Sequence, residues 1–182
     1  MASLIVVFYI LIVIFGVIGA GRGWAKEMLI IFSVILALAL IAVFEDLLPY
    51  TRDLIQDGTI VQFWFRALIT IGLVIFGYQT PKFSRIAPAT VKRDQIQELL
   101  LGLLLGLING FLIVGTLWSY MDHAKYPFAP HITSPAATGD QKLIDASNSL
   151  LRLFIPSTAL GSPPWIYVIV VLSFVFVIIV FL

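Results

Sequence analysis

The stretch Gly19–Glu27, GAGRGWAKE, decides the fold, because it is the first charged segment of the chain and long apolar runs flank it on both sides. Such a glycine-rich basic segment is either a phosphate-binding loop or a sharp corner between two membrane helices. A dinucleotide fingerprint requires G-x-G-x-x-G after a strand, but Trp24 stands where the third glycine belongs. The apolar run Ala2–Ala20 before it suits a membrane span better than a strand. The sequence therefore predicts a corner.

The composition of the whole chain supports this prediction. Its 182 residues are 60% hydrophobic and 12% charged, with a mean hydropathy of +1.06. Charged residues make up about a quarter of an ordinary soluble domain, so the composition indicates a polytopic membrane protein. There is no cysteine, which excludes disulfides and thiol chemistry. The net charge of +1 gives no reason to expect nucleic acid as a partner.

Several apolar runs have the length of about 17–25 residues that a membrane-spanning helix requires. Helices satisfy all their backbone groups internally, which is required at membrane depth. We therefore predict an all-α transmembrane bundle of about five spans. The first is a retained span, because no Lys or Arg precedes it as in a secretory signal. The predicted spans are Ala2–Ala20, Met28–Phe44, Ile60–Tyr78, Leu99–Met121 and Trp165–Leu182.

The distribution of Lys and Arg predicts the orientation of these spans. The first and third connections carry most of the basic residues outside the long fourth loop, and the second connection is acidic. Basic loops favour the cytoplasmic side. We therefore expect the N-terminus outside and the C-terminus in the cytoplasm.

The long loop before the last span contains the segment Asp140–Phe154, DQKLIDASNSLLRLF, whose apolar residues recur at helical spacing. Two alternatives remain open for it: an amphipathic helix in the membrane interface, or an ordinary helix packed on its neighbours. The chain accordingly divides into a four-span bundle with this segment, residues 1–156, and a linker with the additional span, residues 157–182. We expect that span at the periphery, because it contains no glycine for close packing.

The fourth span carries the clearest packing pattern. Small residues at a spacing of four let another helix approach closely, and a polar amide can hydrogen-bond across the contact. The substitution Gly106→Leu is expected to disrupt this contact. Leu103→Phe is expected to be milder, because Leu103 is predicted to lie on a different face of the helix. Contact within the bundle and contact with a partner protein both remain open. The predicted packing residues are Gly102, Gly106, Asn109 and Gly110.

Four other residues are predicted to anchor the chain at the membrane surface. Arg22 and Lys26 can reach lipid phosphates, Trp24 suits the headgroup level, and Glu27 can neutralise one of the two bases. Arg66 lies inside the third span at a depth from which its side chain can extend to the interface. The carboxylates of the preceding loop, Asp53 and Asp57, are its possible partners.

The sequence shows no pattern of catalytic or metal-binding residues. His123 and His131 are the only histidines, and their spacing across Pro127 and Pro130 is no ligand signature. We therefore expect a protein that is not an enzyme and has neither a cofactor nor a metal site.

Two glycine-bearing segments resemble a known family. Phe15–Leu38 resembles the first helical hairpin of the colicin V production protein family, whose G-x-x-R-G-x-x-[KR]-E corner matches Gly19, Arg22, Gly23, Lys26 and Glu27. Leu100–Gly115 resembles the family's glycine-rich fourth span, although Asn109 stands where the family usually has a basic residue. Leu143–Pro156 looks like the amphipathic segment that follows. The resemblance implies a bacterial inner-membrane protein with a role in toxin export or envelope maintenance.

Three functions are compatible with these features. The first is the role that the resemblance implies, and the second is that of a structural or accessory subunit of a respiratory or photosynthetic complex. The third, a small transporter or channel, has the least support, because such pathways normally require ionisable residues inside the spans. The expected partners are the lipid bilayer and either other membrane-protein subunits or a second copy of the chain.

Overall fold

The described residues form helices joined by turns and loops, with no strand among them. The computed structural model describes residues 4–47, 55–79, 95–154, 156 and 164–181. Within these ranges, Val43–Leu47 form a π-helical turn directly after α2 (Trp24–Ala42). A short 3-10 helix, Pro135–Thr138, precedes α6 (Gln141–Leu153). The α-helices are α1 (Leu4–Arg22), α2 (Trp24–Ala42), α4 (Ile60–Tyr78), α5 (Gln95–His123), α6 (Gln141–Leu153) and α7 (Trp165–Phe181).

Four of these helices are long and apolar enough to cross a membrane: α1, α2 with its continuation to Glu45, α4 and α5. The prediction of an all-α chain with several candidate spans is therefore confirmed. α7 has 17 described residues and is shorter than these four candidate spans. The fifth span therefore stays a prediction.

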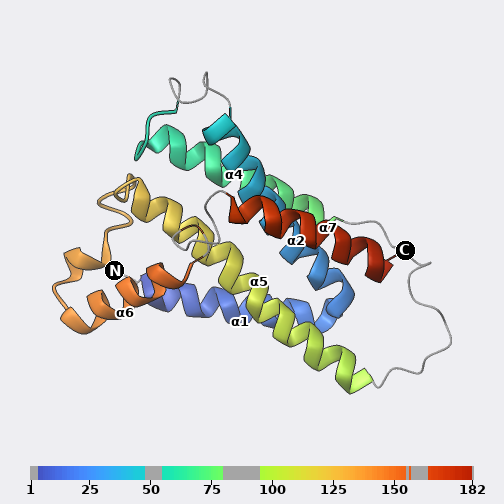
Figure 1. Cartoon of the computed structure of the whole chain (residues 1–182). Coiled ribbons are helices and arrows are strands. Elements are labelled where there is room, and N and C mark those ends of the chain that lie inside the picture. Colours follow the sequence, from blue (N-terminus) through green and yellow to red (C-terminus); the bar gives the residue numbers. More distant parts are fainter. Residues whose placement is uncertain (1–3, 48–54, 80–94, 155, 157–163, 182) are drawn as a thin grey trace.

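The helix that packs along α1 is α5, and not its neighbour in sequence, α2 (Figure 1). α1 and α5 run antiparallel, so that Gly19 meets the start of α5 while Ile12 meets Gly110 further along. α2 leaves the corner in another direction and packs against α4, α5 and α7. The predicted corner is present at Gly23, but the helix that packs closely on α1 is α5, because the glycine faces of these two helices allow a closer approach.

The four long helices alternate in direction between two ends of the bundle. At one end, called here the corner end, Arg22 donates to the carbonyl of Tyr78 at 3.3 Å, and Glu98 lies beside Gly23. The other end, the far end, brings Glu45 to Arg66. Glu27 and Glu45 mark these two ends on the α2 segment, about 27 Å apart at 1.5 Å per residue, close to the thickness of a hydrocarbon core.

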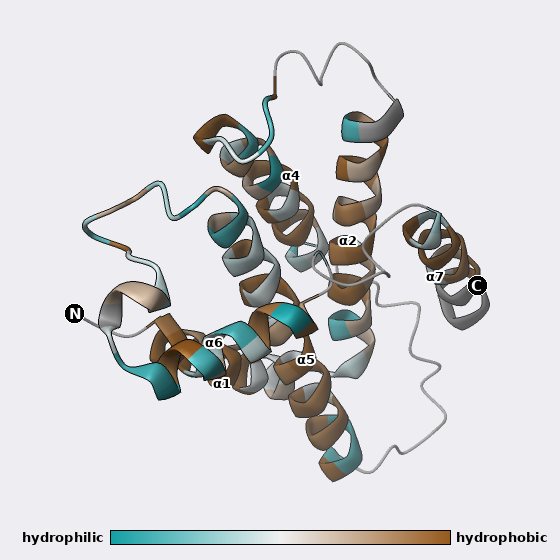
Figure 2. Ribbon diagram, turned by 60° about the vertical axis from the view of Figure 1, so that its left-hand side comes forward, coloured by the Kyte–Doolittle hydropathy of each residue, from teal (hydrophilic) through white to brown (hydrophobic). Residues whose placement is uncertain are grey.

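Helix α6 is amphipathic and lies against the bundle near the beginning of α1 (Figure 2). The Asp140 side chain caps it by accepting a hydrogen bond from the backbone N–H of Lys142 at 3.0 Å. Its apolar side packs with Phe8, Trp118 and Phe154. The structure therefore shows that this helix packs on its neighbours and exposes its polar side. Its place in the membrane interface stays a prediction.

Helix α7 packs on α2, and its first turn enters the core. The Phe174 ring contacts the Phe32 ring edge to face, with centroids 4.8 Å apart. Ile166 is buried in one hydrophobic cluster with Ile113 and Tyr120 of α5. Further along the helix, Val171 and Leu172 are exposed. α7 thus combines an attached beginning with an outward face, while residues 157–163 of the predicted linker lie outside the described residues.

The outer surfaces of the long helices are apolar, as the hydropathy colouring of Figure 2 shows. Apolar side chains this exposed are stable in contact with lipid but not with water. The surface therefore fits the hydrocarbon of a bilayer. On α1 and α4 the exposed residues include Val6, Ile10, Val13, Val17, Val61, Trp64, Leu68, Ile75 and Phe76.

Candidate functional site

The glycines of α5 form a close contact with the backbone of α1. A Cβ added to Gly106 would overlap the Phe15 carbonyl oxygen and lie 3.0 Å from the Cα atoms of both Gly16 and Gly19. Gly102 and Gly110 meet the α1 backbone in the same way. Because backbone atoms cannot rotate aside, only glycine fits this contact.

Leu103 belongs to the same contact. Its Cδ1 atom would lie 3.4 Å from a Cβ added to Gly16, so the expectation that it occupies a different face is wrong. The neighbouring Leu104 is 54% exposed and does face outward.

The corner itself depends on Gly23. This residue has φ of 85°, in a region that L side chains rarely adopt, and its N–H still donates to the Gly19 carbonyl at 3.0 Å. A Cβ at Gly23 would also lie 2.9 Å from Oε1 of Glu98. The chain therefore changes direction within one residue, and the start of α2 comes to lie against α5.

That change of direction buries Glu27 completely, with 0% of its surface exposed. The Asn109 amide donates to Glu27 twice, at 2.8 Å to Oε2 and at 2.9 Å to the backbone carbonyl. Arg22 donates to Oε1 at 3.3 Å and forms an ion pair with it. The carboxylate is thus paired on both oxygens, which offsets the large cost of burying a charge.

Arg22 is held by a second residue, Tyr78. Its guanidinium carbon lies 4.2 Å from the centroid of the Tyr78 ring, a cation–π contact, and its Nη2 donates to the Tyr78 carbonyl. Arg22, Glu27, Tyr78 and Asn109 come from four different helices, and we call them the corner cluster. Their charges cancel, so the cluster joins the helices without leaving a net charge in the bundle.

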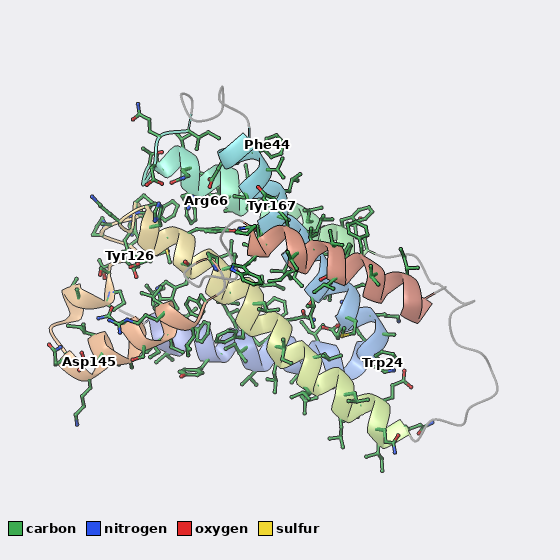
Figure 3. The ribbon with its side chains drawn as sticks, in the orientation of Figure 1. Trp24, Phe44, Arg66, Tyr126, Asp145 and Tyr167 are labelled. Atoms are coloured by element: carbon green, nitrogen blue, oxygen red, sulfur yellow. The ribbon has the colours of Figure 1, made fainter. Side chains whose placement is uncertain are left out.

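The other residues predicted as anchors lie at the edges of this arrangement. Trp24 lies at the corner between α1 and α2 (Figure 3), and Lys26 is exposed beside it. Their contact with lipid headgroups stays a prediction. Arg22, by contrast, is committed to its partners within the protein.

A second cluster lies at the far end, where Figure 3 shows Arg66 well away from Trp24. Arg66 donates to both oxygens of Glu45, at 2.7 Å from Nε and 2.8 Å from Nη2, and Gln62 donates to the same carboxylate at 3.3 Å. We call Glu45, Gln62 and Arg66 the far-end cluster. Such a two-pronged geometry is the strongest form of an ion pair. The prediction that Asp57 is the partner of Arg66 is therefore wrong. The other candidate partner, Asp53, lies outside the described residues.

Asp57 pairs instead with His123, whose Nε2 lies 2.7 Å from the Asp57 carboxylate. The hydrogen bond from His123 is the main cause that lowers the pKa of Asp57 below its usual value of 3.8. This contact ties the end of α5 to the loop before α4.

Acid is expected to weaken this tie. A carboxyl with a lowered pKa contributes stability above its unfolded pKa, and loses it as the pH falls through the folded value. Between about pH 5 and pH 3 the wild-type melting temperature in detergent should therefore fall more than that of Asp57→Asn. The effect is small, because both side chains are exposed. Equal falls in the two proteins would contradict a stabilising role of the pair.

The charged side chains of both clusters are paired with each other. Within the described residues, no group of three His, Asp or Glu side chains is placed to hold a metal ion. His131 is exposed on the loop that follows α5. The arrangement is suited to hold helices together and to carry polar groups into the bundle.

Comparison with known proteins adds no further assignment: no protein-family model matches the chain, and neither a curated protein nor a solved structure is similar to it.

The sequence prediction missed the burial of Glu27 and the pairing of Glu45. A signal for Glu27 existed, because the buried positions of α2, Ile30, Val34 and Ile41, extend backward at helical spacing to Glu27. Because the predicted span began at Met28, it left Glu27 out of that buried face.

Proposed function

We propose that the protein is a non-enzymatic, multi-pass inner-membrane protein of the colicin V production type, which serves toxin export or envelope homeostasis as a helical scaffold. The observation that carries the proposal is the corner cluster. The two segments that resemble the family are distant in sequence, yet Gly19, Gly23 and Glu27 of one contact Gly102, Gly106 and Asn109 of the other. A common role for both motifs in one junction explains why they occur together.

The physical character of the junction supports a scaffold role. Backbone contacts between glycines are rigid, and the paired Arg22 and Glu27 hold the corner in one geometry. Outside this junction the long helices offer apolar surface to the bilayer. A rigid interior with an apolar exterior suits a protein that organises other components of the membrane.

An accessory-subunit role is the alternative, and the outward face of α7 favours it. Among the described residues, the main packing partner of α7 is α2. On the outward face of α7, Val168, Val171 and Leu172 are exposed. Such a face can receive an apolar helix of another subunit as well as lipid.

Deletion of the gene in its native host tests the proposal. We expect the deletion strain to take up more of a membrane-impermeant dye under envelope stress, or to export less toxin. The wild-type gene and a Glu98→Leu variant should restore the parental behaviour, because Glu98 is exposed. Glu27→Leu, which removes the centre of the corner cluster, should not.

Two outcomes of this experiment count against the proposal. Unchanged dye uptake and unchanged toxin export in the deletion strain would contradict a role in the envelope. If the purified chain also carried other membrane subunits in fixed proportion, the accessory-subunit alternative would replace it.

The proposed orientation places the corner end in the cytoplasm. Because the chain has no cysteine, single cysteines report their own side of the membrane. A membrane-impermeant maleimide should label Ala136→Cys in intact spheroplasts, and label Ala89→Cys only after permeabilisation. Labelling in the opposite pattern would reverse the orientation, and labelling of both from outside would mean that α5 does not span.

A further inference from the structure

Polar side chains line the interior of the bundle between the corner cluster and the far-end cluster. On α5, Asn109, Thr116 and Tyr120 are buried and recur at helical spacing on one face. On α4, Thr70 is fully buried, and its hydroxyl lies 3.4 Å from the Tyr120 hydroxyl. The Tyr120 ring in turn lies 5.7 Å from the guanidinium carbon of Arg66. Polar groups thus continue inward from the far-end cluster.

Four buried side-chain oxygen atoms have no hydrogen-bond partner among the described residues: the Tyr78 hydroxyl, Asn109 Oδ1, Thr116 Oγ1 and the Tyr167 hydroxyl. Asn109 is 0% exposed and Thr116 is 1% exposed. In proteins about 90% of buried polar groups are hydrogen-bonded, and hydrocarbon offers them no partner. Oxygens of this kind are the ones that bind buried water. They therefore mark positions where water can enter the bundle.

One apolar layer separates the polar groups of the two ends. On α5, Ile113 lies between Asn109 and Thr116, and on α4, Val74 lies between Thr70 and Tyr78. Both belong to one buried hydrophobic cluster, to which α2 contributes Ile30 and Val34. The polar residues on either side are roughly 10–12 Å apart along their helices, so the layer is about one or two turns thick. Narrow apolar layers of this kind close membrane pathways by excluding water.

We propose that this line of polar side chains is a proton pathway across the membrane, closed at rest by the layer of Ile30, Val34, Val74 and Ile113. A proton needs only a chain of hydrogen-bonded oxygens, whereas a hydrated ion needs a continuous opening, which the packed layer does not leave. The proton enters from water at one end and leaves at the other, so the side chains are unchanged after each passage.

The ionisable pairs at both ends fit such a pathway. Glu27 with Arg22 lies at the corner end, and Glu45 with Arg66 lies at the far end. Ionisable residues inside membrane spans commonly mark proton relays. The pathway goes beyond the proposed scaffold role and does not rest on it, because proton flux is measured without any envelope phenotype.

Proton flux into liposomes that contain the purified full chain tests the proposal. A potassium gradient with valinomycin sets the membrane potential, and an internal pH-sensitive dye reports the flux. Val74→Thr places a hydroxyl between Thr70 and Tyr78 with little change of shape, and it should raise the flux about tenfold over wild type. The same change at Val61, which is 55% exposed on α4, is the matched control and should leave the flux unchanged.

Two further variants make the test independent of a single substitution. Ile113→Thr should raise the flux as well, which covers the case that Val74→Thr fails to fold. Adding Thr70→Val to Val74→Thr should return the flux to the wild-type value, because it removes the neighbouring hydroxyl. The proposal is overturned if Val74→Thr and Ile113→Thr, both folded and inserted, conduct no faster than Val61→Thr. It is also overturned if the added Thr70→Val leaves the increased flux in place.

Discussion

Gly106→Ala is expected to destabilise the protein by about 3 kcal/mol, at the upper end of the usual range for overpacking. The added methyl group would overlap the Phe15 carbonyl oxygen and press on the backbone of Gly16 and Gly19. None of these atoms can move without shifting α1 as a whole. Unfolding of the purified protein by titration with a denaturing detergent, followed by tryptophan fluorescence, measures the change.

Gly72 provides the matched control on α4. It is a helical glycine with no atom within 4 Å of an added Cβ. Gly72→Ala should therefore leave stability unchanged or raise it by up to about 1 kcal/mol, because alanine is the better helix former. If both alanine variants unfolded at the same detergent concentration, the close contact between α1 and α5 would be contradicted.

Glu27→Leu is expected to have an effect at least as large, about 3–5 kcal/mol, the usual cost of removing one partner of a buried ion pair. The leucine would leave the Arg22 guanidinium without its carboxylate and the Asn109 amide without the side-chain oxygen that it contacts. The same unfolding measurement applies. Cells should also contain less of the variant protein, because destabilised membrane proteins are degraded.

Glu98→Leu is the control for this substitution. It makes the same chemical change at an exposed position of α5, and exposed substitutions usually alter stability by less than about 0.5 kcal/mol. A similar loss in both variants would mean that the burial of Glu27 has no special role.

The sequence predicted four of the five proposed spans as long apolar helices, because the required length follows directly from the thickness of the hydrocarbon. The third predicted span, Ile60–Tyr78, has the same bounds as α4. The apolar face of Asp140–Phe154 was equally clear, since Leu143, Ala146 and Leu150 recur at helical spacing and pack together. Both features depend only on residues close to one another in the chain.

The pairing of the helices could not be predicted in the same way. Asn109 was expected to bond across a contact, but its partner Glu27 lies 82 residues away in the chain. The choice of Glu45 rather than Asp57 as the partner of Arg66 depends on the side of α2 that faces α4. Which side of a helix faces which neighbour depends on the packing of all the helices together. The spacing of residues within one helix does not determine it.

A double-mutant cycle between Glu27 and Asn109 tests the central claim most directly, namely that the corner of the first two helices is locked to α5 by a buried polar junction. Unfolding free energies are measured for wild type, Glu27→Leu, Asn109→Leu and the double variant. The two side chains bond directly. The double variant should therefore lose at least about 1 kcal/mol less unfolding free energy than the sum of the losses in the two single variants. Losses that add to within about 0.5 kcal/mol would contradict the junction.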